Sequence, residues 1–238
     1  MKNKLQELKQ EKNAKMYKIA WARYEQPNVN NNNKPTWVLS AKEFKEGFTE
    51  DILGEVAHGA IDSNFTNLDA MKAALTEVDV LIDESYGVRT LEGSLRKYGL
   101  EDTPAEAMNY KFIKNRMVLR TDGLRTENDG NDWYQSGMVH ADVVLQDLIR
   151  ALYMRQSHSM ERYWIRNIAS DEHFQFIIND NNTMAHQVSE VKAIGCEEID
   201  WDNVNLRMRK DESSATLLHT SVTAITAVLA VMAGHYYL

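Results

Sequence analysis

Residues 134–152, with the sequence YQSGMVHADVVLQDLIRAL, carry a heptad-like apolar pattern. The spacing between its apolar members alternates between four and three: Tyr134, Met138, Ala141, Leu145, Leu148 and Leu152. Such a spacing places these side chains on one face of a helix over nearly three heptads. The stretch therefore predicts a helix that packs against another helix, either from the same chain or from a neighbour.

Helix signals also stand on both sides of this stretch. Ser40 and Glu43 fit a capping box, and the segment Thr103–Glu106 combines a capping hydroxyl, a proline at the first helical position and an acid at the third. Asn67 is expected to cap a further helix, in which Leu68, Met71, Leu75, Val78 and Ile82 share one face. We expect helices over 40–59, 67–87, 103–119 and 183–195.

The segment between two of these helices contains turn signals. Asp122-Gly123 and Asp129-Gly130 are pairs that favour tight turns. The sequence therefore predicts a mainly α protein, a helical bundle with one short hairpin or exposed acidic loop near 120–132.

The N-terminal residues have a different composition. Residues 1–25 are rich in lysine and predict a basic helix, and four consecutive asparagines between Pro27 and Pro35 predict a loop. We therefore expect a basic arm with an Asn-rich loop over 1–35, followed by a helical body over 36–238 that includes an uncharged helix over 214–236.

Composition and charge exclude several classes of protein. The 238 residues are 43% hydrophobic with a net charge of -8, which argues against disorder and against broad, non-specific nucleic-acid binding. The single cysteine, Cys196, cannot form an internal disulfide. No apolar signal-peptide core lies near the N-terminus, so we expect a cytoplasmic protein, or one within a particle assembled inside the cell, and not one secreted by a signal peptide.

The C-terminal segment has no Asp, Glu, Lys or Arg after Glu212. It is long enough to cross a bilayer as a tail anchor, with Tyr236 and Tyr237 at the interface. The interpretation that we favour is burial within protein, because the segment has one large apolar stripe and one stripe of small residues and threonines. The large stripe would contact a neighbour through Leu218, Val222, Ile225, Leu229 and Met232.

Glu55 and His58 form an E-x-x-H element that could bind one metal ion if it lies on a helix. The sequence has no second copy of this element, and an incidental surface pair is the favoured interpretation. No other cofactor is expected, because nucleotide-binding, hydrolase and zinc motifs are all missing from the sequence.

Arg155, His158, Arg162 and Arg166 step by three and four and would form a basic stripe on one continuous helix. Such a stripe could bind phosphate or nucleic acid. A solvated face with ion pairs to acidic loops is the interpretation that we prefer.

These patterns contain no complete catalytic set. Our leading hypothesis is a structural, protein–protein interaction subunit of a homo-oligomer or larger assembly, with a virion component as one example. It would bury the 134–152 seam and the C-terminal helix against neighbours. The alternatives are a helical-bundle metal enzyme that uses Glu55 and His58, and a tail-anchored membrane protein. Nucleic acid is an allowed partner but not a favoured one.

Overall fold

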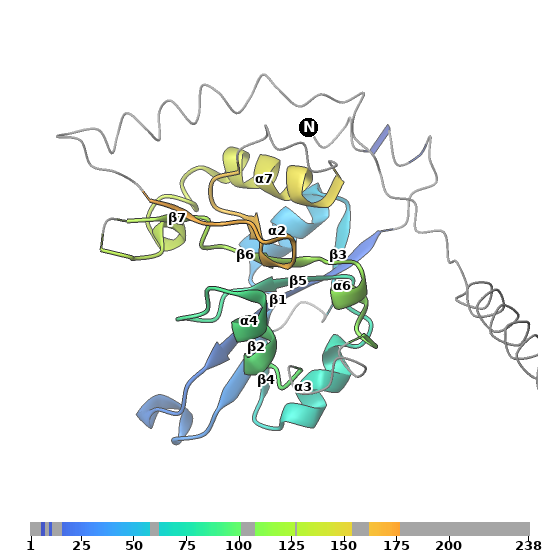
Figure 1. Cartoon of the computed structure of the whole chain (residues 1–238). Coiled ribbons are helices and arrows are strands. Elements are labelled where there is room, and N and C mark those ends of the chain that lie inside the picture. The colour runs from blue at the N-terminus through green and yellow to red at the C-terminus, as the bar shows by residue number, and fades with distance from the viewer. Residues whose placement is uncertain are drawn as a thin grey trace, which may run out of the picture.

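The computed structural model of the chain describes residues 6, 7, 10, 16–57, 62–100, 108–126, 128–153 and 162–176. These residues form a seven-stranded mixed sheet with helices on both faces, which is an α/β fold (Figure 1). The prediction of an all-α helical bundle is therefore wrong. The physical reason is that several short apolar runs, which we assigned to helices, are strands buried on both faces.

The sheet has the order β4-β2-β1-β5-β6-β8, and β3 also pairs with β1. Three pairings are parallel, β1 with β3, β1 with β5, and β5 with β6, while β2, β4 and β8 join through antiparallel pairings. The strands are β1 (Tyr17–Glu25), β2 (Thr36–Ser40), β3 (Gly54–Val56), β4 (Ser63–Phe65), β5 (Val80–Asp83), β6 (Val118–Arg120) and β8 (Arg166–Asn167). A separate parallel pair consists of β7 (Leu124–Arg125) and β9 (Gln175–Phe176).

Both faces of β1 are buried, as expected for a strand in the middle of a sheet. Ile19 and Trp21 belong to one hydrophobic cluster, while Ala20 and Ala22 belong to the other. Successive side chains of a strand point to opposite faces, so a strand that is covered on both sides reads as an unbroken apolar run. β5 repeats the pattern, with Val80 and Ile82 on one side of the sheet and Leu81 on the other.

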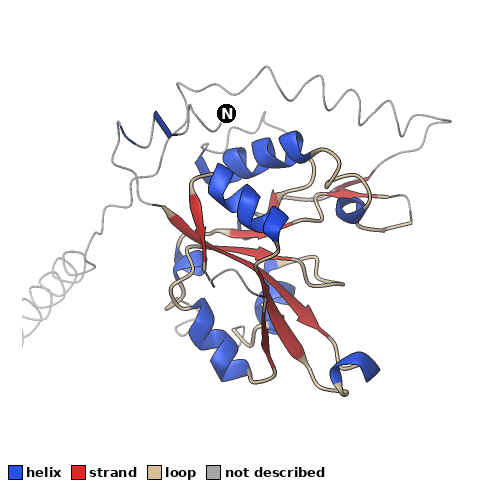
Figure 2. Cartoon of the chain, turned by 180° about the vertical axis from the view of Figure 1, so that it is seen from behind, coloured by secondary structure: helices blue, strands red, loops and turns tan. Residues whose placement is uncertain are grey.

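Helices cover both faces (Figure 2). On one face, α2 (Glu43–Asp51) and α7 (Ala141–Tyr153) contribute to the cluster that contains Trp21. On the other face lie α3 (Leu68–Leu75), α4 (Leu91–Lys97) and α6 (Lys111–Lys114). Short 3-10 turns complete the elements: η1 (Val29–Asn31), η2 (Asp132–Tyr134) and η3 (Ile168–Ser170).

The basic helix predicted over 1–25 is wrong for its second half, because Tyr17–Glu25 is β1. The boundary proposed at residue 35 falls between β1 and β2, which pair along Trp21–Glu25 and Thr36–Ser40. Asn28 caps η1 in the loop between them, so the segment rich in asparagine is a loop, as predicted.

The helices predicted over 40–59 and 67–87 are each too long. The helix predicted over 103–119 does not continue past Lys114, and its predicted start at Thr103–Glu106 lies outside the described residues. Ser40 ends β2 and Lys42 precedes α2 without a side-chain cap, so the predicted capping box does not form. Asn67 does cap α3, since its side chain accepts from the backbone amides of Asp69 and Ala70. The apolar residues that follow α3 belong to β5, and those before residue 120 belong to β6.

The seam over 134–152 is α-helical only from Ala141, and Tyr134 lies in the 3-10 turn η2. Leu148 and Leu152 are buried in the cluster that also contains strand residues of β1, β5 and β6, and Leu145 and Met138 pack against it. The seam therefore packs against the chain's own sheet, while Tyr134 at its start is 65% exposed.

Two further predicted segments, the helix over 183–195 and the uncharged segment over 214–236, lie outside the described residues. The same holds for Leu218, Val222, Ile225, Leu229 and Met232. Within the described part of the chain, no helix is long and apolar enough to cross a membrane.

Candidate functional site

The order of the parallel strands defines where a site is expected. They run β3-β1-β5-β6 across the sheet, so chain order changes direction between β1 and β5. The connection from β1 to β3 includes α2 on one face, and the connection from β3 to β5 includes α3 on the other. In open α/β sheets, ligands bind outside the carboxyl ends of the strands at this switch point. We call the residues at and just after the carboxyl ends of β1, β5 and β6 the carboxyl edge.

A buried ion pair lies at the switch point. Lys45 of α2 donates to Glu84, which directly follows β5, and the two side chains are only 4% and 3% exposed. The Lys45 ammonium also lies 5.5 Å from the centre of the Trp21 ring of β1. Burial lowers the pKa of Lys45, although the charge of Glu84 opposes that effect. A buried lysine with a lowered pKa beside a carboxylate is a candidate functional group.

Tyr134 lies close to this pair at the surface. Partial burial and the charge of Glu84 raise the pKa of its phenol, while Arg23 and Arg120 act in the opposite direction. The pKa of this hydroxyl is therefore shifted by charged side chains on β1, on β6 and at the end of β5. With 65% of the residue exposed, Tyr134 is accessible to a ligand that approaches the carboxyl edge.

Asp83, the last residue of β5, is linked to β6 by a hydrogen bond from Arg120. One of its carboxylate oxygens, Oδ1, accepts from the Ser85 backbone amide at 2.9 Å and from the Tyr98 hydroxyl at 3.0 Å. The other oxygen accepts from Ser94 Oγ at 2.6 Å and from Arg120 Nη1 at 2.9 Å. Asp83 is fully buried and well supplied with donors, so it acts as an anchor that holds Arg120 in place.

Asp122 holds further guanidinium groups after the end of β6. Arg166 Nε donates to its Oδ1 at 2.7 Å, Arg125 Nη2 donates to its Oδ2 at 2.6 Å, and Arg120 Nε lies 3.1 Å from the same Oδ2. Burial alone would raise the pKa of Asp122, but the hydrogen bond from Arg166 and the charge of Arg120 outweigh it and hold the pKa below its ordinary value.

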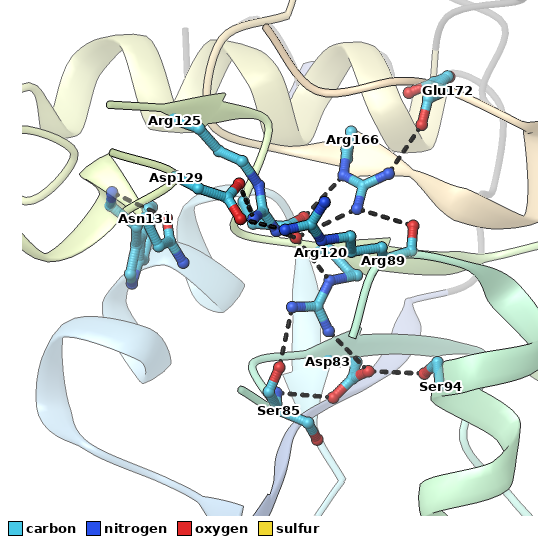
Figure 3. Close-up of polar contacts among 12 residues, drawn as sticks. Asp83, Ser85, Arg89, Ser94, Arg120, Arg125, Asp129, Asn131, Arg166 and Glu172 are labelled. Carbon is cyan, nitrogen blue, oxygen red and sulfur yellow. Dashed lines mark hydrogen bonds and ion pairs between the residues drawn. The ribbon is translucent and has the colours of Figure 1, made fainter. Parts of the chain in front are cut away.

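The network of ion pairs around Asp83 and Asp122 extends to the surface through Arg89 and Asp129. Arg125 Nη1 donates to Asp129 Oδ1 at 2.7 Å, and Arg89 donates to the other oxygen of the same carboxylate (Figure 3). The Arg89 side chain is 54% exposed. We call Arg89, Arg120, Arg125 and Arg166 the arginine cluster.

The charges of this cluster do not balance. Four guanidinium groups share three carboxylates, those of Asp83, Asp122 and Asp129. The chain as a whole carries a net charge of -8, so a positive excess at this position is a local feature of the fold. An excess guanidinium at an accessible edge is suited to bind an anion.

The residues of the predicted metal site are not on a helix. Glu55 lies in β3 and is exposed, and His58 is outside the described residues. The helical spacing on which the E-x-x-H interpretation depended is therefore wrong at Glu55. Within the described ranges, no group of three or more His, Cys, Asp or Glu residues could hold a metal ion.

The predicted basic stripe also depended on one continuous helix. The structure ends α7 at Tyr153 and places Arg166 in β8, 5% exposed and paired with Asp122. Arg162 pairs with Glu172. Both arginines thus take part in ion pairs within the chain, and Arg166 is not on a solvated face. Arg155 and His158 lie outside the described residues.

The acidic loop predicted near 120–132 contains much of the cluster. Arg125 and Asn131 form an antiparallel bridge, as a short hairpin would, but Asp122 and Asp132 are each 1% exposed. The loop is therefore largely a buried charge network and not an exposed acidic surface.

Sequence reasoning missed Lys45, Glu84, Asp83, Arg120 and Asp122. The signal was present, because VLIDES over 80–85 and VLRTD over 118–122 each combine a short apolar run with polar residues directly after it. Two such segments indicate neighbouring parallel strands that end at one edge of a sheet. No family model, curated protein or solved structure matches this chain.

Proposed function

We propose that this protein binds a small anionic molecule at the carboxyl edge of β1, β5 and β6. The observation that carries the proposal is the arginine cluster, in which four guanidinium groups share three carboxylates beside the carboxyl ends of β5 and β6. The topology supports the same location, because the carboxyl ends of parallel strands at a switch point are where open α/β sheets bind ligands.

The buried members of the cluster hold its frame in place. Arg120 and Arg166 are 3% and 5% exposed, so their positions are set before any ligand arrives. Arg89 is the exposed member and the first that an incoming anion would meet. Preorganised donors bind more tightly because little ordering remains to be done on association.

A reaction at this edge would use the groups at the switch point. Lys45, Glu84 and Tyr134 are the titratable side chains there, and the phenol is accessible. In this role, the Lys45–Glu84 pair would exchange protons with the ligand that the arginine cluster holds. Catalysis is an extension of the binding proposal and does not need to hold for binding to occur.

The test is a thermal-shift survey of the full chain with phosphates, diphosphates, nucleotides and dicarboxylates, each beside its uncharged parent compound. We expect at least one anion to raise the melting temperature, since a ligand that binds only the folded state stabilises it, while its uncharged parent does not. Stabilisation by uncharged compounds alone, or by none of the anions, would contradict the proposal.

Assembly into a homo-oligomer or larger particle stays a separate proposal. Its remaining support is the uncharged segment after Glu212, because the inner part of the 134–152 seam is covered by the chain's own sheet. A tail-anchored form depends on the same segment. Light scattering of detergent-free protein tests the first proposal, and carbonate extraction of a membrane fraction tests the second.

A further inference from the structure

The carboxylate of Asp129 bridges two guanidinium groups. Its Oδ1 accepts from Arg125 Nη1 at 2.7 Å and its Oδ2 accepts from Arg89 Nη2. This is the arrangement in which two arginines hold a phosphate group, with separate oxygens facing separate forks. The two guanidinium groups therefore converge on a single carboxylate.

Asp129 is much more exposed to solvent than the other carboxylates of the cluster. Its side chain is 38% exposed, whereas those of Asp83 and Asp122 are 0% and 1% exposed. It lies at positive φ in a short loop where the Thr126 amide donates to the Gly130 carbonyl at 2.9 Å. Its pair with Arg89 is exposed and contributes little stability, whereas its pair with Arg125, whose side chain is 8% exposed, is a contact that an incoming anion must replace.

The two arginines would keep their positions after Asp129 leaves. Arg125 retains its 2.6 Å hydrogen bond to Asp122, and the ring of Phe174 lies against the guanidinium carbons of Arg125 and Arg89 at 4.5 and 5.9 Å. The Arg89 carbonyl accepts from Arg166 Nη2 at 3.1 Å, which fixes the backbone from which the Arg89 side chain extends. The site is thus assembled without its ligand.

We propose that Arg89 and Arg125 form a phosphate-binding pair and that Asp129 is an internal placeholder, which the phosphate group of a ligand displaces. The inference rests on the proposed function and names its ligand class, a phosphate monoester or diphosphate. Phosphate is favoured over carboxylate because a doubly charged group with three free oxygens can engage both guanidinium forks and replace a singly charged carboxylate.

The experiment is isothermal titration calorimetry of inorganic pyrophosphate into the full chain. Asp129→Asn removes the competing charge, and Asn tolerates the left-handed backbone at this position. The matched control is Asp171→Asn, which makes the same change of charge at another exposed aspartate with positive φ. Arg89→Ala removes one fork, and its control is Arg96→Ala, whose exposed side chain pairs with Glu92 on α4.

We expect Asp129→Asn to bind pyrophosphate at least about two- to fivefold more tightly than the wild type, which is the strength of the exposed Arg89–Asp129 pair alone. Arg89→Ala should bind it roughly tenfold more weakly, since a charge-assisted contact is lost. The two control variants should bind as the wild type does.

Three outcomes would overturn the placeholder role: equal effects of the Asp129 and Asp171 variants, wild-type binding by Arg89→Ala, or no binding of pyrophosphate to any variant at millimolar concentration. The proposed function fails separately, when no anion of the thermal-shift survey stabilises the chain. A ligand that stabilises the chain but is indifferent to Asp129 and Arg89 would refute this inference and leave anion binding intact.

Discussion

Replacing Asp147 by asparagine should change how the stability of the fold depends on pH. Asp147 lies on α7 and is completely buried. Its Oδ2 accepts from three successive backbone amides, those of Tyr163, Trp164 and Ile165, at 2.9, 2.8 and 3.2 Å. Burial raises its pKa from 3.8 to about 6, although these hydrogen bonds and the charge of Arg162 oppose the rise.

The sign follows from the raised pKa. A carboxyl group that holds its proton more tightly in the folded state favours folding at low pH, and that contribution is lost as the pH rises through the folded pKa. Ionised Asp147 therefore destabilises the fold at neutral pH. With pKa values of 3.8 and about 6, the loss between pH 4.5 and 7.5 amounts to about 2 kcal/mol.

Asparagine keeps an acceptor for the three amides but does not titrate. The Asp147→Asn substitution also changes the unfolding free energy by an amount that does not depend on pH, because the new amide N–H groups need acceptors. The difference in unfolding free energy, Asp147→Asn minus wild type, should nevertheless rise by about 2 kcal/mol from pH 4.5 to pH 7.5. Urea unfolding followed by tryptophan fluorescence measures it, with Asp171→Asn as a control at an exposed position. A difference that stays constant or falls over this range would refute the argument.

Three other substitutions test the packing around the site. A Cβ at Gly123 would lie 2.4 Å from the carbonyl oxygen of Tyr163, so Gly123→Ala should lower the unfolding free energy by roughly 1–3 kcal/mol in urea. Gly47→Ala in α2, where a Cβ meets nothing within 4 Å, should instead raise it by about 0.5–1 kcal/mol. A rise for Gly123→Ala or a fall for Gly47→Ala would contradict the packing. Asp122→Asn removes the negative charge that pairs with the buried guanidinium groups of Arg125 and Arg166, and it should lower the unfolding free energy by roughly 3–5 kcal/mol at neutral pH. Because the pKa of Asp122 is lowered, the stability that its carboxylate contributes is lost as the pH falls. The loss of unfolding free energy in Asp122→Asn, relative to the wild type, should therefore become smaller in acid. A loss that becomes larger in acid would contradict the ion-pair network.

The helices with clear local signals were the most predictable part of the fold. Asn67 caps α3 through its side chain, and Leu148 and Leu152 of the predicted apolar face of α7 are buried. Both features depend on contacts within a few residues or on one helical period, which a single sequence displays directly.

The strands could not be told from helices by period alone. β5 and β6 are four and three residues long. Ile82 of β5 continued the helical steps of the preceding segment, and Leu119 of β6 was placed at the end of the helix predicted from residue 103. A strand buried on both faces has no alternation to display, so its short run resembles part of a buried helix. Gly87, with φ +72, lies in a turn after β5, whereas the sequence pattern placed it at the end of a helix.

The site was hidden for a related reason. Asp83, Arg120 and Arg166 are distant in sequence and meet only because β5, β6 and β8 are neighbours in the sheet. Once the sheet is known, the polar residues after two buried strands point to its carboxyl edge. The charge excess became visible only from the ion pairs themselves.

The most direct test of the account is a crystal structure of the full chain with the anion that gives the largest thermal shift. We predict that the anion lies between Arg89 and Arg125 at hydrogen-bond distance, with the carboxylate of Asp129 turned away from both. An anion bound at any other surface, with the contacts of Asp129 to both arginines intact, would contradict the account.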